Sequence, residues 1–229
     1  MLRIPTTQIV AATFALALGT ALVGSGPAQA SNFPDPVADA PLAAASGSET
    51  AVFSGGCFWG IQAVFEHVKG VTKATAGYSG GAEAKAHYEI VSTGTTGHAE
   101  SVEVVFDPSK ITYGQLLKVF LSVAHDPTEL NRQGPDEGTQ YRSAIWVTSP
   151  EQEKTAKAYI AQLDAAKLFQ DKIVTQVNSL VAFYAAEGYH QDYLVHHPNQ
   201  PYIVFNDLPK IADLHKTWPD LYVEYRPES

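Results

Sequence analysis

The sequence predicts an α+β domain, a two-layer sandwich in which helices cover a mixed β-sheet, with a ferredoxin-like core and extra C-terminal segments. Segments with the two-residue period of strands alternate with segments of helical period, in the order strand, helix, strand, strand, helix, strand, helix, strand. Hydrophobic residues make up 45% of the 229 residues, which is enough to bury a core. No repeat or second linker interrupts the chain after residue 49, so we expect one folded domain over residues 49–229.

Residues 1–30 are typical of a secretion signal peptide. Arg3 supplies a positive charge, residues 9–23 form an apolar stretch without charges, and Ala28-Gln29-Ala30 fits a cleavage site. A membrane span is the alternative, but the apolar stretch is shorter than the roughly 20 residues that a bilayer requires. We therefore expect an exported, periplasmic protein. Residues 31–48, rich in Ala, Ser and Pro, predict a flexible linker.

The first strand and helix of the domain meet at a glycine-framed turn. A strand is predicted over Thr50–Ser54, and a helix begins at once after it. The apolar face of this helix is formed by Phe58, Ile61, Val64, Phe65 and Val68. Gly55 and Gly56 allow a tight connection between the two elements. Cys57 is therefore expected where the strand turns into the helix.

The remaining strands and helices are also predicted from short stretches of the sequence. Further strands are predicted over Ala74–Tyr78, Glu100–Phe106, Ser143–Val147 and Ile173–Val177. Thr112 and Gln115 have capping-box spacing, and Ser149 stands before Pro150, so helices should begin after Thr112 and after Ser149. Shorter helical pieces are expected over residues 189–195 and 208–216.

Charge and cysteine content narrow the class of function. The net charge of −9, without a cluster of Lys or Arg, argues against binding to nucleic acid. Exported domains normally pair their cysteines in disulfides, yet this chain has a single cysteine, Cys57. An internal disulfide is impossible, so Cys57 is either an inert buried residue or a reactive thiol.

The surroundings of Cys57 favour a reactive thiol. At the first turn of a helix, free backbone N–H groups and the helix dipole favour thiolate over thiol. Phe58 and Trp59 follow directly and place aromatic surface beside the sulfur, which suits a small apolar group. A structural cysteine among core aromatics is the alternative, and the glycine-framed turn argues against it.

A second candidate lies in the strand that follows Gly97-His98-Ala99. Strand alternation places Glu100 on the same face as the apolar residues Val102, Val104 and Phe106. A carboxyl group there is partly desolvated, which raises its pKa and makes it a proton donor near neutral pH. A solvated Glu100 at a frayed strand end is the alternative. The polar connection over residues 125–143 is a third candidate, because loops of this length often carry function.

Six ordered blocks of the chain carry a resemblance. They are Gly56-Cys57-Phe58-Trp59-Gly60, Gly77-Tyr78-Ser79-Gly80-Gly81, Thr96-Gly97-His98-Ala99-Glu100, His125-Asp126-Pro127-Thr128, Gly138-Thr139-Gln140-Tyr141-Arg142-Ser143 and Tyr189-His190-Gln191. Together they resemble the peptide methionine sulfoxide reductase A family over nearly all of residues 50–210. The resemblance implies a thiol oxidoreductase that reduces the S epimer of methionine sulfoxide, free or in oxidised proteins, and so repairs oxidative damage.

The resemblance also implies roles for individual residues. Cys57 matches the nucleophile, which becomes a sulfenic acid, and Glu100 matches the acid. The positions implied to bind the substrate are Phe58, Trp59, Tyr88, Asp136 and Tyr141. The first two match the wall that receives the substrate methyl group, and the other three match positions around the sulfoxide oxygen. His98 and His190 lie inside matching blocks and are interpreted as supporting or structural residues.

The chain departs from many family members at its C-terminal end. Those members carry further cysteines that condense with the sulfenic acid, whereas residues 190–229 contain none. The chain therefore resembles the one-cysteine type, whose catalytic cysteine is recycled by an external thiol such as thioredoxin, glutaredoxin, glutathione or another dithiol. We expect no bound cofactor, no metal, no nucleic acid partner, no membrane span after signal removal, and a monomer.

Several other functions remain open from the residues alone. Cys57 could act with a histidine and a carboxylate in a hydrolase or acyltransferase, or serve a thiol peroxidase. His190, Asp192, His196 and His197 could hold a metal ion. A binding module without catalysis would need Cys57 to be inert.

Overall fold

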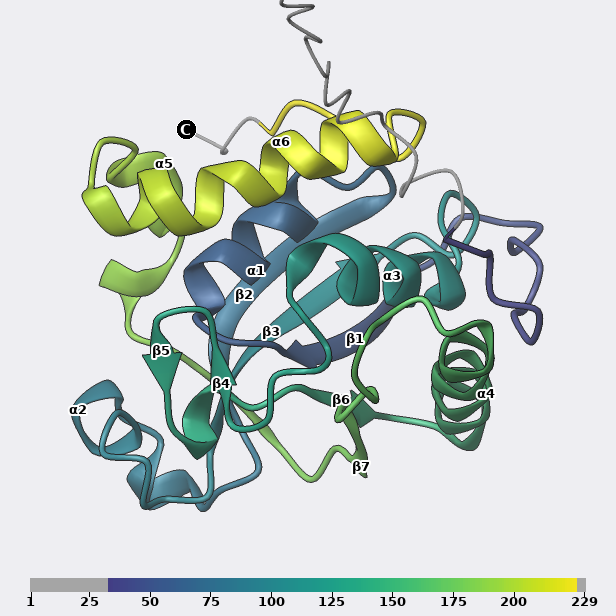
Figure 1. The fold of residues 1–229 in the computed structure, drawn as a ribbon. Helices are drawn as coiled ribbons and strands as arrows, with labels where there is room; N and C mark the ends of the chain where they lie inside the picture. Colours follow the sequence, from purple (N-terminus) through teal and green to yellow (C-terminus); the bar gives the residue numbers. More distant parts are fainter. Residues whose placement is uncertain (1–32, 226–229) are drawn as a thin grey trace, which may run out of the picture.

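Six elements form the core of the fold in a computed structural model that describes residues 33–225. In chain order they are β1 (Glu49–Ser54), α1 (Phe58–Glu66), β2 (Val71–Ser79), β3 (Ala99–Phe106), α3 (Tyr113–Val119) and β6 (Ala144–Val147). The strands stand in the order β6-β1-β3-β2, and each neighbouring pair is antiparallel. Helices α1 and α3 lie on the same face of this sheet (Figure 1). The α+β class and the ferredoxin-like core are confirmed.

Two further strands extend the sheet at its edges. β7 (Gln176–Ser179) pairs with β6 in parallel, and β8 (Phe183–Ala185) pairs with β2 antiparallel, which makes the sheet mixed. The prediction placed β7 too early, over Ile173–Val177. Val174 instead donates its backbone N–H to the carbonyl of Pro127, so this part of the chain is tied to a loop before it reaches β6.

The two predicted helix starts are confirmed by their caps. The Thr112 hydroxyl accepts the Gln115 N–H at 3.1 Å, and the Gln115 side chain accepts the Thr112 N–H at 3.0 Å. Helix α3 then continues into a π-helical turn, η3 (Phe120–Ala124). Helix α4 (Pro150–Ala166) begins after Ser149, whose hydroxyl accepts the Gln152 N–H. No helix within residues 33–225 is long and apolar enough to cross a membrane.

Short elements join the core elements and had weaker sequence signals. They are η2 (Glu83–Lys85), α2 (Tyr88–Val91), β4 (Arg132–Gln133), β5 (Asp136–Glu137), η4 (Thr139–Tyr141), η5 (Gly188–His190), α5 (Tyr193–His196), η6 (Ile203–Asp207) and α6 (Leu208–Thr217). The pieces predicted over residues 189–195 and 208–216 correspond to η5, α5 and α6. Figure 1 shows α2, the β4–β5 hairpin and α5 on the same side of the molecule, on the left.

The core lies between the sheet and the helices of one layer. Phe53 of β1 stacks on Phe65 of α1 at 5.2 Å between ring centroids and on Phe120 of η3 at 4.8 Å. Val102 and Val104 of β3 are fully buried in the same cluster. Contacts of this kind hold α1 rigidly on the sheet, and with it the turn that carries Cys57.

Composition predicted a flexible linker over residues 31–48, and two residues of this segment, Phe33 and Asp39, contact the folded domain. The Phe33 ring lies edge-on to the rings of Tyr159, Phe169 and Trp218, at 6.2 to 6.5 Å. The Asp39 carboxylate accepts the Gly114 N–H at 3.0 Å, and the Thr112 hydroxyl also donates to it. Composition could not show these contacts, because the partners are more than 70 residues away along the chain. The predicted signal peptide, residues 1–30, lies outside the described residues.

Asp39→Ala is expected to lower the stability of the domain by about 1 kcal/mol, because it removes a carboxylate that caps the N-terminus of α3. For a domain of this size that loss corresponds to a fall in Tm of about 2–4 °C in a thermal melt. Asp35→Ala is the matched control. Asp35 pairs with Lys118 at 2.7 Å, but its side chain is 81% exposed, so this pair should contribute less. An equal fall in both variants would contradict the capping role.

Candidate active site

The turn before α1 fixes the position of Cys57. Gly56 has a φ of +95°, a conformation that favours glycine. A side chain there would also collide with Gln133, because a Cβ atom on Gly56 would lie 2.5 Å from the Cβ of Gln133. The β4 strand of the 125–143 connection therefore packs directly over this turn. Cys57 lies immediately before the first residue of α1 and is 8% exposed.

The electrostatic surroundings of Cys57 favour the thiol in the resting protein. Burial raises the pKa of Cys57 well above its ordinary value, and the carboxyl groups of Glu100 and Asp207 raise it further. The backbone N–H of Trp59 acts in the opposite direction but does not outweigh them. The expectation that the helix N-terminus holds a resting thiolate is wrong, because it ignored the desolvation that the folded chain imposes.

Glu100 lies on the buried face of β3, as strand alternation predicted. Its side chain is 2% exposed, and its Oε2 accepts the backbone N–H of Phe58 at 2.9 Å. Burial raises the pKa of Glu100 to about 8, although the hydrogen bond from Phe58 partly opposes the shift. The carboxyl group is therefore mainly protonated at neutral pH and can donate a proton. A solvated Glu100 at a frayed strand end is excluded.

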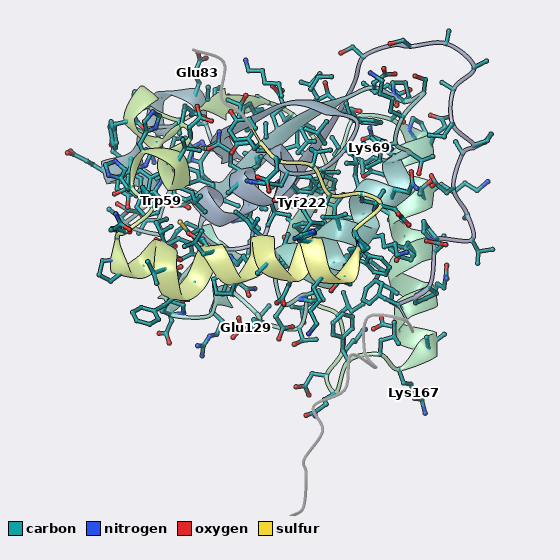
Figure 2. The ribbon with its side chains drawn as sticks, turned by 90° about the horizontal axis from the view of Figure 1, so that it is seen from above. Trp59, Lys69, Glu83, Glu129, Lys167 and Tyr222 are labelled. Carbon is teal, nitrogen blue, oxygen red and sulfur yellow. The ribbon has the colours of Figure 1, made fainter. Side chains whose placement is uncertain are left out.

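The two aromatic residues after Cys57 occupy different environments. Phe58 is 1% exposed, and its ring lies 5.8 Å from that of Tyr78 and 5.0 Å from that of His190. Trp59 is half-buried and stacks on Tyr193 with 3.7 Å between ring centroids. Figure 2 shows Trp59 near the end of the long yellow helical segment, on the side of the molecule away from Lys167. Phe58 is thus an interior surface, and Trp59 is the aromatic surface nearer to solvent.

Two tyrosines from separate short elements lie near Glu100 and Cys57, whose charges act on both phenols. Tyr88 begins α2 and Tyr141 ends η4, and both are half-buried. Burial raises the pKa of Tyr88 to about 12, with further contributions from Glu100 and Cys57. Burial and Glu100 also raise the pKa of Tyr141. Both phenols keep their protons at neutral pH, so both can donate hydrogen bonds toward an oxygen held between them.

Asp136 connects the C-terminal segment to the site through a hydrogen bond with Tyr202. It is half-buried on β5, burial raises its pKa, and its carboxyl group accepts a hydrogen bond from the Tyr202 hydroxyl. Tyr202 also meets Trp59 edge-on at 5.9 Å. No sequence block pointed to Tyr202. The Pro201-Tyr202 pair lies in a stretch without a helical or strand period.

Asp207 is a second residue that the sequence reasoning missed. It is fully buried, and its Oδ1 lies 3.3 Å from the Lys210 Nζ. A Cβ atom on Gly60 would lie 2.1 Å from that oxygen, so the glycine lets Asp207 approach α1. In the sequence, Asp207 and Lys210 are three residues apart, which is the spacing of an ion pair on a helix, and this spacing was the signal that could have identified them. Only the fold shows that this pair lies against the helix of Cys57.

The two histidines of the matching blocks differ in their connection to the site. His190 is 1% exposed, and its Nδ1 accepts the indole N–H of Trp59 at 3.1 Å. His98 is also buried, but its Nδ1 lies 2.9 Å from the Thr96 hydroxyl, and its ring meets the edge of Tyr78. His190 therefore contacts a predicted substrate-binding residue directly, whereas His98 lies behind Tyr78.

The alternatives that use histidine find little support in this geometry. None of the histidines between residues 33 and 225 forms a hydrogen bond with Cys57. The ring nitrogens of His125 lie 2.9 Å from the Phe120 carbonyl and 2.7 Å from the Ser143 hydroxyl. In the same part of the chain, no three His, Cys, Asp or Glu side chains are grouped so as to hold a metal ion. His196 Nδ1 instead lies 3.0 Å from the backbone oxygen of Asp192.

Sequence comparison gives one family. The family model described as peptide methionine sulfoxide reductase matches residues 49–222. Peptide methionine sulfoxide reductase MsrA 2 of Mesorhizobium japonicum is 61% identical over 181 residues, which cover 79% of this chain and 93% of the relative. The protein of the same name from Synechocystis sp. is 53% identical over 189 residues, covering 82% of this chain and 88% of the relative.

Solved structures agree with this result. Mxr1 from Saccharomyces cerevisiae in its reduced form superposes with a TM-score of 0.61 at 32% identity, over 67% of this chain and 87% of that chain. Methionine sulfoxide reductase A of Corynebacterium diphtheriae gives a TM-score of 0.58 at 37% identity, over 67% of this chain and 77% of that chain.

Proposed function

Because this chain belongs to the peptide methionine sulfoxide reductase family, we propose that its Cys57 attacks the sulfoxide sulfur while Glu100 gives a proton to the sulfoxide oxygen. The protein is an enzyme that reduces methionine sulfoxide to methionine. One observation carries the assignment of residues. The 2.9 Å hydrogen bond from the Phe58 N–H to Glu100 ties a buried, protonated carboxyl group to the turn that carries the thiol.

The substrate sulfur has three different substituents to place, and the site offers a matching surface for two of them. The methyl group lies against Phe58 and Trp59, which present apolar aromatic surface. The oxygen faces Glu100 and the phenols of Tyr88 and Tyr141, which keep their protons at neutral pH. When the methyl group and the oxygen are held in these two places, the epimers differ in where the rest of methionine must lie. Only one epimer then leaves its sulfur open to Cys57. We assign this preference to the S epimer.

The first chemical step balances without a proton from solvent. Glu100 protonates the sulfoxide oxygen, which makes it a better leaving group, and Cys57 attacks the sulfur. The thiol proton of Cys57 passes to the Glu100 carboxylate. The attack forms a bond between Cys57 Sγ and the substrate sulfur. The hydroxyl group then moves from the substrate sulfur to Sγ, so the S–O bond and the new S–S bond both break, methionine leaves, and Cys57 carries the hydroxyl as a sulfenic acid. Cys57 is oxidised and the sulfoxide is reduced, each by two electrons.

Recycling needs thiols from outside the chain, because Cys57 is its only cysteine. One external thiol condenses with the sulfenic acid, which releases water and forms a mixed disulfide. A second thiol displaces it, which frees Cys57 and leaves the reductant as a disulfide. Two molecules of glutathione, or one dithiol such as glutaredoxin or thioredoxin, can supply these two sulfurs.

The location of the enzyme is also a proposal. The charged start, apolar stretch and Ala28-Gln29-Ala30 site of residues 1–30 support export to the periplasm. Mass spectrometry of the protein recovered from the periplasm should show an N-terminus at Ser31. A full-length chain retained in the cytoplasm would contradict export.

The proposed reaction is tested with separated epimers. We expect steady turnover of S-methionine sulfoxide, free and within an oxidised protein, when glutathione or dithiothreitol is present. The R epimer should be turned over at no more than background rate, and without a thiol the reaction should stop after one equivalent. Turnover of an acyl ester in place of the sulfoxide would contradict the proposal. So would many turnovers without an external thiol.

A further inference from the structure

The Trp59 indole is held on three sides. One face stacks on Tyr193, with 3.7 Å between ring centroids and an angle of 5° between the planes. Its ring meets Tyr202 at 85°, with 5.9 Å between centroids. Its N–H donates to His190 Nδ1 at 3.1 Å. The two ring contacts are apolar and allow sliding, whereas the hydrogen bond fixes the rotation of the indole within its plane.

His190 can accept this hydrogen bond only as a neutral imidazole. An imidazolium carries protons on both nitrogens and has no acceptor. Burial lowers the pKa of His190, so the neutral form dominates at neutral pH. Because Nδ1 accepts from Trp59, the proton resides on Nε2, which lies 4.0 Å from Glu187 Oε2.

The same histidine touches both sides of the proposed substrate site. Its ring lies 5.0 Å from that of Phe58 and 4.4 Å from that of Tyr88. Glu187, which faces Nε2, accepts the Tyr88 backbone N–H at 3.0 Å and the Tyr78 hydroxyl at 2.9 Å. The residues on the methyl side and on the oxygen side are therefore fixed relative to each other through one buried ring.

We propose that His190 is a positioning residue that sets the preference for an S-methyl group, by holding the Trp59 indole in one rotation against the site of Cys57. This inference rests on the proposed function, in which Phe58 and Trp59 receive the methyl group. An aromatic wall fixed in one rotation limits the size of the alkyl group that can lie against it. A wall that can rotate admits a larger alkyl group and holds a methyl group less tightly.

The test compares S epimers of methionine sulfoxide and ethionine sulfoxide, whose alkyl groups differ by one methylene. We expect the wild-type enzyme to prefer the methyl compound in kcat/KM by about 10- to 200-fold, the usual selectivity for one methylene. His190→Phe keeps an aromatic ring but has no acceptor, and its preference should fall to about threefold or less, mainly through a higher KM for the methyl compound. His190→Asn offers an amide oxygen near the position of Nδ1 and should restore most of the preference.

A merely structural role predicts a different pattern. In that case His190→Phe lowers kcat/KM for both sulfoxides by the same factor and leaves their ratio unchanged, which would overturn the inference. His67→Phe is the matched control. His67 is a buried histidine that follows the C-terminal end of α1, whereas Trp59 lies at its N-terminal end. Its Nδ1 lies 2.7 Å from the Ala63 carbonyl, and its ring stacks on that of Tyr222. Figure 2 shows Tyr222 well separated from Trp59, so this variant should keep the wild-type ratio.

A second measurement keeps the inference testable if His190→Phe does not fold. In the unmodified enzyme labelled with 15N-tryptophan, the Trp59 indole proton should exchange with solvent much more slowly than an exposed indole. If the Trp59 indole proton exchanged as fast as that of an exposed indole, the inference would be overturned. Failure of the proposed function looks different, because the wild-type enzyme would then not reduce S-methionine sulfoxide at all.

Discussion

Cys57→Ser is expected to abolish reduction of methionine sulfoxide, with a loss of turnover on the order of 10⁴-fold or more. The serine hydroxyl is a weak nucleophile, and its oxygen cannot take up the sulfoxide oxygen to form a counterpart of the sulfenic acid. The side chain is buried but small, so the fold should persist. The measurement is the steady rate of S-methionine sulfoxide loss in excess dithiothreitol, with a thermal melt of the same preparation.

Cys57→Ala serves as the control for the hydroxyl group. Both variants should lose activity equally, because the reaction needs the sulfur and not merely a polar atom at this position. A Cys57→Ser enzyme that retains more than about a hundredth of the wild-type rate would contradict the nucleophilic role.

Glu100→Gln is expected to lower kcat by about 10²- to 10⁴-fold, the usual contribution of general acid catalysis. Glutamine has the size of glutamate, and its oxygen can still accept the Phe58 N–H that Glu100 accepts at 2.9 Å. The position of α1 should therefore be preserved while the transferable proton is lost. Unchanged kcat in a folded Glu100→Gln enzyme would contradict the acid role.

The pH profile gives an independent check on Glu100. Its raised pKa means that the protonated acid is present below pH 8 and is lost as the pH rises through about 8. In the wild-type enzyme, this loss should reduce kcat/KM above pH 8. The descending limb at this pH should be absent from the residual activity of Glu100→Gln.

The raised pKa of Glu100 also makes the stability of the folded protein depend on pH. The ordinary pKa of the carboxyl group is 4.5 and that in the folded protein is about 8, so between these values the folded state binds a proton that the unfolded chain has released. The contribution of Glu100 to stability therefore falls as the pH rises from 4.5 to about 8. Glu100→Gln removes this dependence and should be the more stable protein above pH 8, while being the poorer enzyme.

Local patterns predicted the parts of the fold that depend on neighbouring residues. The capping box of Thr112 and Gln115 and the alternation of β3 were legible in the sequence, because each involves residues within a few positions. The strand face also gave the burial of Glu100. The short element α2 had no such signal, since a helix of four residues has too few positions to show a period.

Properties that depend on distant partners were missed or predicted with the wrong sign. The helix N-terminus at Cys57 was visible, but the desolvation and the carboxyl group of Asp207 that outweigh it come from the rest of the fold. Tyr202 reaches Asp136 across 66 positions of the chain, and Asp39 reaches Gly114 across 75. Composition made the segment around Asp39 look like a linker, because it records residue types and not their partners.

A single turnover without reductant tests the central claim most directly. The enzyme is mixed with one equivalent of S-methionine sulfoxide in the absence of any thiol, and both methionine and the intact protein mass are measured. The proposed chemistry predicts one equivalent of methionine and a gain of about 16 Da on Cys57, which a sulfenic acid trap such as dimedone captures and added glutathione reverses. Methionine formed with Cys57 unmodified, or no methionine at all, would contradict it.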